Sequence, residues 1–122
     1  MKVAIVGSRG INDYGLVRRK IIQYFWHEYT SKPLDFSIVS GGARGVDALA
    51  KRFAEEFSIP IEEVKPDWEQ WGKSAGIRRN IEIIRKCDVV LILWDGISKG
   101  TRHDIEEAYR QKKDMILITK IS

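Results

Sequence analysis

Short apolar runs alternate with amphipathic segments along the chain, and this alternation constrains the fold more than any other feature. Runs rich in β-branched residues have the length of buried strands, and they cover residues 2–7, 35–40, 59–66, 88–94 and 114–120. Segments with apolar residues at helical spacing lie between them, at residues 13–29, 43–57, 69–87 and 100–113. This order predicts an α/β fold with a parallel sheet and helices on both faces, because each helix returns the chain to the start of the next strand.

Composition also predicts where two of these strands lie in the sheet and how many domains the chain forms. Residues 88–94, DVVLILW, are the most apolar run and are expected in the interior of the sheet. Residues 59–66 carry charges and prolines and are expected near an edge. No linker rich in proline and glycine divides the 122 residues, so a single domain over residues 1–122 is predicted.

The overall composition argues against several classes of protein. Cys87 is the only cysteine, so no internal disulfide can form, and no apolar run approaches ~20 residues. We therefore expect a cytoplasmic protein without a membrane partner. The 21 Lys and Arg exceed the 17 Asp and Glu, which gives a formal charge of +4. This excess suits an anionic ligand but is too evenly spread to indicate nucleic acid by itself.

The ends of the predicted strands carry most of the glycines and several polar side chains. These residues are Gly7, Ser8, Arg9, Gly41, Gly42, Arg44, Gly45, Asp47, Gly100 and Thr101. The carboxyl ends of parallel strands meet at one edge, which is where such sheets bind ligands. Glycines let a backbone approach a ligand, and helix N-termini favour anions. The pattern predicts a site for a nucleotide or another phosphorylated sugar.

The stretch VSGGARGVDALA, residues 39–50, is the most informative of these loops. It lacks the lysine of a phosphate loop, so we expect it to hold a ribose-phosphate portion rather than a triphosphate. Arg44 suits a phosphate. Asp47 suits either a ribose hydroxyl or the start of its own helix, where it would complement the dipole and cap local amides. Trp68, after the third strand, suits either a base stack or the rim of the core.

Together these segments resemble the SLOG superfamily, and within it the YspA-like branch. The resemblance rests on the segments GSRG (7–10), VSGGARGVDALA (39–50), DWEQWGKSAGIRRN (67–80) and WDGISKGT (94–101), which occur in this order. It implies a Rossmann-like three-layer sandwich whose five parallel strands have the order 3-2-1-4-5. It also implies a ligand of the AMP or ADP-ribose type. The superfamily includes LOG phosphoribohydrolases, which release a base from a nucleoside monophosphate, and DprA, which binds single-stranded DNA.

The resemblance also implies roles for three residues outside the loops. Arg79 matches the arginine of the Arg-Lys pair of LOG enzymes, and Asn80 stands where those enzymes have the lysine. Asp104 stands where they have a glutamate, three residues after Thr101, and the Pro-Gly-Gly that opens their loop is absent here. Arg79 and Asp104 are thus the catalytic candidates if the ligand is cleaved, and Asn80 is a ligand-binding candidate.

Three functional interpretations remain open at this point. The first is a nucleotide-binding protein that also hydrolyses an N-glycosidic bond or only senses the ligand; the second is a DprA-like module for single-stranded nucleic acid. The third is an interaction role in a homo-oligomer. No metal or other cofactor is expected, since the acidic residues around His103 match no zinc spacing. Magnesium arriving with a phosphate is the one exception that we keep.

Overall fold

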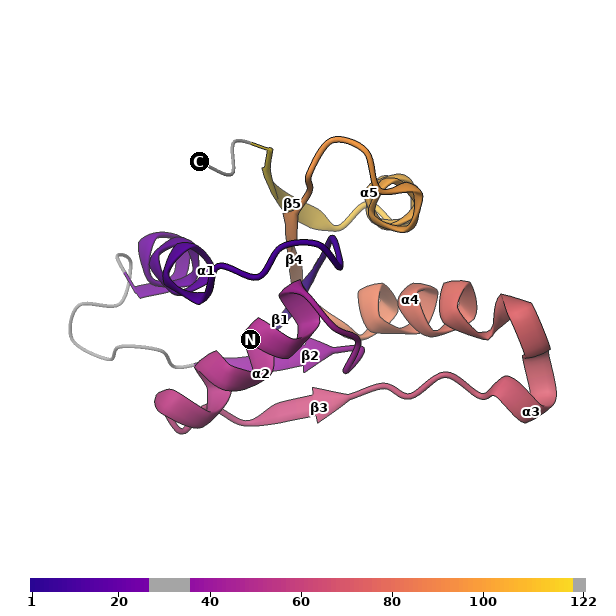
Figure 1. Cartoon of the computed structure of the whole chain (residues 1–122), viewed down its shortest axis with the longest axis horizontal. Helices are drawn as coiled ribbons and strands as arrows, with labels where there is room; N and C mark the ends of the chain where they lie inside the picture. The colour runs from indigo at the N-terminus through magenta and orange to yellow at the C-terminus, as the bar shows by residue number, and fades with distance from the viewer. Residues whose placement is uncertain (27–35, 120–122) are drawn as a thin grey trace.

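The strands of the computed structural model, which describes residues 1–26 and 36–119, form one parallel sheet (Figure 1). They are β1 (Lys2–Gly7), β2 (Ser37–Ser40), β3 (Ile61–Glu63), β4 (Val89–Leu93) and β5 (Asp114–Ile118). The order is β3-β2-β1-β4-β5, and every neighbouring pair is parallel. The predicted fold class and strand order are therefore confirmed, as are the interior place of DVVLILW and the edge place of the charged strand.

The helices follow the predicted segments, and the third of these segments is divided. They are α1 (Tyr14–Ile21), which continues as the π-helical turn η1 (Ile22–Trp26), then α2 (Val46–Glu56), α3 (Trp68–Trp71), the 3-10 turn η2 (Gly72–Ser74), α4 (Ala75–Lys86) and α5 (Lys99–Arg110). Gly72 and Gly76 were expected to blur the start of the helix within residues 69–87; Gly72, with a φ of +53°, ends α3, and α4 begins at Ala75. The predicted helix end at 27–29 and the strand ends at 35 and 120 lie outside the described residues.

Alternation along β1 divides the core between the two faces of the sheet. Val3 and Ile5 belong to the cluster that packs under α1 and α2. Ala4 and Val6 face the other way, into the cluster under α4 and α5. The two helical layers on either side of the sheet are visible in Figure 1. All four of these β1 side chains are at least 97% buried, so this strand is the centre of both cores.

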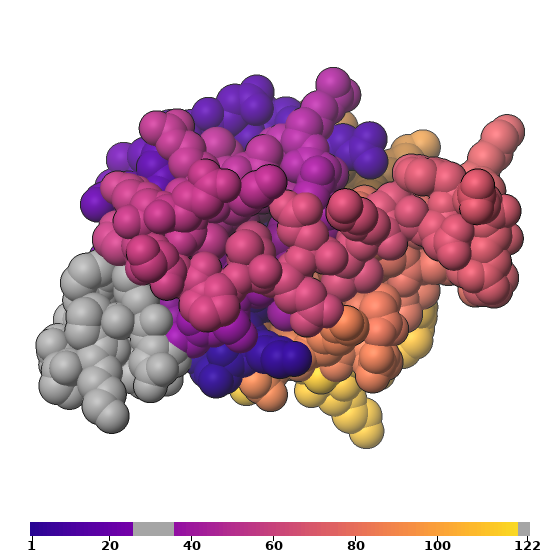
Figure 2. Space-filling view, turned by 90° about the horizontal axis from the view of Figure 1, so that it is seen from below, coloured from indigo at the N-terminus to yellow at the C-terminus, as the bar shows by residue number. Residues whose placement is uncertain are grey.

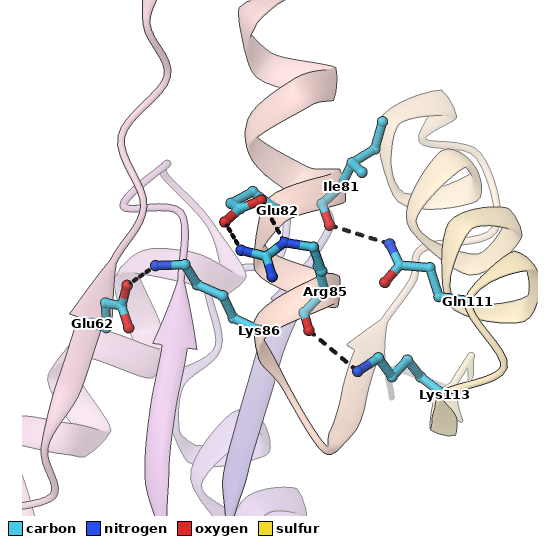
Figure 3. Close-up of polar contacts among 7 residues, drawn as sticks. All are labelled: Glu62, Ile81, Glu82, Arg85, Lys86, Gln111 and Lys113. Carbon is cyan, nitrogen blue, oxygen red and sulfur yellow. Dashed lines mark hydrogen bonds and ion pairs between the residues drawn. The ribbon is translucent and has the colours of Figure 1, made fainter.

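Polar contacts hold α4 against its neighbours (Figure 3). Lys86 of α4 pairs with Glu62 of β3. On the α5 side, Gln111 Nε2 donates to the Ile81 carbonyl at 3.3 Å, and Lys113 Nζ donates to the Arg85 carbonyl at 3.3 Å. These contacts attach α4 both to the edge strand and to the end of α5, and so they fix the helix that carries Arg79.

The short helix α3 projects beyond the sheet. It lies at the end of the molecule farthest from α1 in Figure 1, and the same segment forms a protruding knob at one end of the space-filling view (Figure 2). Asp67 Oδ1 caps the helix by accepting from the Gln70 amide at 3.1 Å. Trp68 and Trp71 are 58% and 41% exposed, so the indoles of α3 are surface groups rather than core.

Candidate ligand site

A cavity of about 280 Å³ opens at the carboxyl edge of the sheet. It brings together eight of the predicted site residues, namely Gly7, Arg9, Asp47, Arg79, Asn80, Gly100, Thr101 and Asp104. Val6, Ala43 and Ser98 complete the lining. The carboxyl ends of β1, β2 and β4 all lead into this cavity, as the placement of ligand sites in parallel sheets requires.

Arg79 is the central cation of the cavity. Its side chain comes from α4, and the residue is 8% exposed. Nη1 donates to the Gly41 carbonyl at 2.7 Å, and Nε donates to the Asn80 side-chain oxygen at 2.8 Å. Two of its donor groups are thus fixed by the protein, which orients the planar guanidinium before any ligand arrives.

Asp47 holds the glycine loop from the inside. Its Oδ2 accepts from the Ala43 amide at 3.2 Å, and the residue is 7% exposed. Burial raises the pKa of Asp47 to about 6, although the Ala43 amide and the cations Arg79 and Arg9 act to lower it. The carboxylate therefore organises the loop through backbone hydrogen bonds as well as facing the cavity.

Asp104 is the least satisfied polar group at this edge. The residue is 4% exposed, and its Oδ1 has no hydrogen-bond partner. Among the buried side chains of the described residues, Ser40 Oγ is the only other polar atom without a partner. Burial and, next, the neighbouring Asp47 carboxylate raise the pKa of Asp104 to about 7, against the opposing effects of Asn80 and Arg79. A buried carboxyl oxygen without a partner is costly, so this atom is available to a ligand.

Ser8 is placed as a structural junction rather than on the cavity wall. The residue is fully buried; its Oγ accepts from the Asp95 amide at 3.1 Å and lies 3.2 Å from Thr101 Oγ1. Its carbonyl accepts from the amides of Ile11 and Val46. One serine therefore joins the loops that follow β1 and β4 to the start of α2.

Two glycines permit this crowding of loops. A Cβ on Gly7 would lie 2.3 Å from the Leu93 carbonyl oxygen. Gly45 has a φ of +76°, and a Cβ there would lie 2.5 Å from the Ser8 carbonyl oxygen. These positions need glycine because one backbone passes directly against another, not only because a ligand approaches.

Six predicted site residues do not line the first cavity, namely Ser8, Gly41, Gly42, Arg44, Gly45 and Trp68. Gly41 acts indirectly, through its carbonyl bond to Arg79. Arg44 is exposed and belongs to none of the three hollows at this end of the molecule. Ala43 and Ser98 were missed, although both follow a strand and position alone could have indicated them. Asp95 was also missed; its Oδ1 accepts from the Ile97 and Ser98 amides at 2.8 Å and so shapes the loop before α5.

A second cavity of about 230 Å³ adjoins the first on the side of α3. The two share Arg9, Arg79, Asn80, Gly100 and Asp104. The residues particular to the second are Trp68, Lys73, Gly76, Ile77, His103 and Glu107. The structure therefore places Trp68, the candidate for base stacking, in a cavity that also contains Asp104.

In residues 1–26 and 36–119, no group of three or more His, Cys, Asp or Glu side chains is arranged to hold a metal ion. No helix in the same ranges is both long and apolar enough to cross a membrane.

The strand order and the polar cavity at the carboxyl edge define a Rossmann-like α/β domain. The chain belongs to the YspA, cpYpsA-related SLOG family, whose model matches residues 1–71. The Gene 61 protein of Mycobacterium phage D29 is 39% identical over 115 residues, covering 89% of each chain. The resemblance to SLOG proteins inferred from the loops is thereby confirmed.

Solved structures of DNA processing protein A share the fold. The protein from Streptococcus pneumoniae superposes with a TM-score of 0.78 at 22% identity, over 98% of this chain and 50% of that one. A Helicobacter pylori structure, described for its single-stranded DNA binding mode, gives 0.71 at 23% identity, over 99% of this chain and 66% of that one. This chain thus spans half to two thirds of those proteins, and the likeness establishes the fold alone.

Proposed function

We propose that this protein binds a nucleotide-derived small molecule of the AMP or ADP-ribose type, with the ribose-phosphate portion in the first cavity. The observation that carries the proposal is the buried, unpartnered Asp104 Oδ1 on the cavity wall, close to the fixed Arg79 guanidinium. A ribose hydroxyl would satisfy the carboxyl oxygen, and the cations would attract the phosphate. Arg9 is exposed at the same cavity and adds a second positive group.

We further propose that Arg79 and Asp104 support cleavage of the N-glycosidic bond. In that hydrolysis, water adds to the anomeric carbon while the base leaves with the electrons of the broken bond and takes up a proton. Asp104 in its ionised form would stabilise the positive charge that develops on the ribosyl ring, and it would also orient the water. Magnesium would be needed only as a companion of a phosphate ligand.

Binding and catalysis are tested in two steps. Thermal unfolding is followed with AMP, ADP-ribose or NAD at millimolar concentration, and a specific ligand raises the midpoint by mass action. The absence of any shift would contradict the binding proposal. Release of free base from nucleoside monophosphates is then measured for the wild type and for Asp104→Ala and Arg79→Ala. Activity that survives both substitutions would remove these two residues from the catalytic roles.

A second candidate function is single-stranded nucleic acid binding. It is supported by the exposed indoles on α3, where the Arg78 guanidinium lies 3.7 Å from the centroid of the Trp71 ring. Aromatic platforms beside cations are typical of surfaces that bind single strands. Such binding must weaken steeply with salt because counterions are released from the phosphates. Affinity for an oligonucleotide that is unchanged between low and physiological ionic strength would exclude this candidate.

A further inference from the structure

The second cavity differs in character from the first, although the two are continuous. The first is lined mainly by charged and hydroxyl-bearing residues, including Asp47, Ser98 and Thr101. The second is bounded by the Trp68 indole, the Ile77 side chain and the bare backbone of Gly76. A Cβ on Gly76 would lie 3.9 Å from Trp68 Cη2, so the indole lies over this first turn of α4.

Exposure of the apolar groups supports a ligand-facing role for this second cavity. Trp68 is 58% exposed and Ile77 is 51% exposed, although both border a recess rather than a flat surface. Lys73 and His103 lie at the same recess and offer hydrogen-bond donors at its rim. A flat, apolar group with polar edges therefore fits this recess, and nucleobases have this chemistry.

We propose that the second cavity is the base subsite of the ligand, with the base stacked on the Trp68 indole. This inference rests on the proposed function, since it assumes that the ribose-phosphate occupies the first cavity. Asp104 and Asn80 border both cavities, so the bond between sugar and base would cross the boundary that they form. The substrate class is then a nucleotide with an intact aromatic base, not a sugar phosphate alone.

The test compares nucleotides with the corresponding sugar phosphate. Isothermal titration calorimetry measures binding of AMP, GMP, CMP, UMP and ribose 5-phosphate to the wild type and to Trp68→Ala. We expect at least one nucleotide to bind the wild type roughly tenfold or more tightly than ribose 5-phosphate, the effect of one aromatic stack. Trp68→Ala is expected to remove this advantage and to leave ribose 5-phosphate binding unchanged.

Trp71→Ala is the matched control. Trp71 lies on the same short helix and is also exposed, but it borders a different hollow, between the segment that follows β3 and α4. Nucleotide affinity is expected to stay within about twofold of wild type in this variant, well below the effect of losing a stack. Gly76→Leu is a second, independent test of the subsite. The leucine side chain would occupy the recess, so nucleotide binding should weaken while binding of ribose 5-phosphate stays unchanged.

The outcomes separate this inference from the function on which it rests. Equal wild-type affinity for the nucleotides and ribose 5-phosphate would overturn the base subsite and leave the ribose-phosphate site standing. The base subsite would also be overturned if the two tryptophan variants behaved alike, or if Trp68→Ala weakened ribose 5-phosphate binding to the same degree. Failure of every compound to bind the wild type would overturn both proposals.

Discussion

The Arg79 guanidinium donates from Nη1 to the backbone carbonyl of Gly41 at 2.7 Å, across 38 residues of sequence. This bond joins α4 to the glycine loop after β2. A Cβ on Gly41 would lie 2.9 Å from both Arg79 Nη1 and Asp47 Oδ2. The cation, the loop and the carboxylate are therefore packed as one unit, and a change at any of them should disturb the other two.

Arg79→Ala is expected to destabilise the fold by about 3 kcal/mol, because it leaves the buried Asp47 and Asp104 without their cation and removes the bond to Gly41. The measurement is urea unfolding at neutral pH. Arg78→Ala is the control: this side chain is exposed and stacks on Trp71, and its loss should cost under about 1 kcal/mol. Similar losses in the two variants would contradict the central role assigned to Arg79.

Asp104→Asn is expected to change how stability depends on pH. The folded-state pKa of Asp104 is raised to about 7, so its favourable contribution is complete below its ordinary value near 3.8 and is lost as pH rises through 7. Urea unfolding at a series of pH values measures this effect. As the pH rises from 5 to 8, the free energy of unfolding of the variant should increase relative to that of wild type by on the order of 2 kcal/mol.

Asp95→Asn provides the comparison for this pH experiment. Hydrogen bonds from the Ser98 and Ile97 amides hold the pKa of Asp95 below its ordinary value, so its contribution is lost only as pH falls through that lowered value. The stability difference between this variant and wild type should therefore be constant from pH 5 to pH 8. If the free energy of unfolding of wild type and of Asp104→Asn changed with pH in parallel over this range, Asp104 would not be buried as described.

Gly45→Ala is expected to cost at least about 2 kcal/mol, since it combines a positive φ with a Cβ only 2.5 Å from neighbouring backbone atoms. Gly10→Ala, in the preceding loop, would meet nothing within 4 Å and should be close to neutral. The measurement is the midpoint of thermal unfolding of the two variants, compared with that of wild type. Equal midpoints would mean that the loop after β2 relaxes without difficulty.

Ser8→Ala is expected to lower stability by about 1–3 kcal/mol, because the Asp95 amide and the Thr101 hydroxyl lose their buried partner. Ser37→Ala, at the start of β2 and half-buried, serves as a control with the same chemical change. Calorimetry below the unfolding transition should still detect nucleotide binding to Ser8→Ala. If the Ser8→Ala protein were folded but did not bind the nucleotide, Ser8 would have to contact the ligand directly.

The sheet and the edge that bears the cavity could be predicted from sequence because both follow from local pattern. Apolar runs mark strands, and the carboxyl ends of parallel strands must meet. The burial of Ser8 could not be predicted, since its partners Thr101 and Asp95 lie roughly ninety positions away. The end of α3 at Gly72 depends on a backbone angle, and the sequence shows only that a glycine is present there.

Individual roles at the site were harder to assign than its location. Asp47 was expected either to contact a ribose hydroxyl or to complement its helix dipole and cap local amides, and its carboxylate does accept the nearby Ala43 amide. Arg44 has the chemistry of a phosphate ligand but lies exposed outside the cavity. Which of two adjacent loop residues turns inward depends on tertiary packing, and local composition carries little information about it.

The projection of α3 beyond the sheet has a consequence for how this protein can diversify. Ser8, Gly7 and Gly45 lie directly against neighbouring loops, strands or helices, so substitution at these positions disturbs the domain itself. Trp68 lies on the short helix α3, which has its own cap and contains no buried residue. Under the proposed base subsite, substitutions in α3 would alter the choice of ligand while the sheet and the Arg79 and Asp104 side chains stay the same.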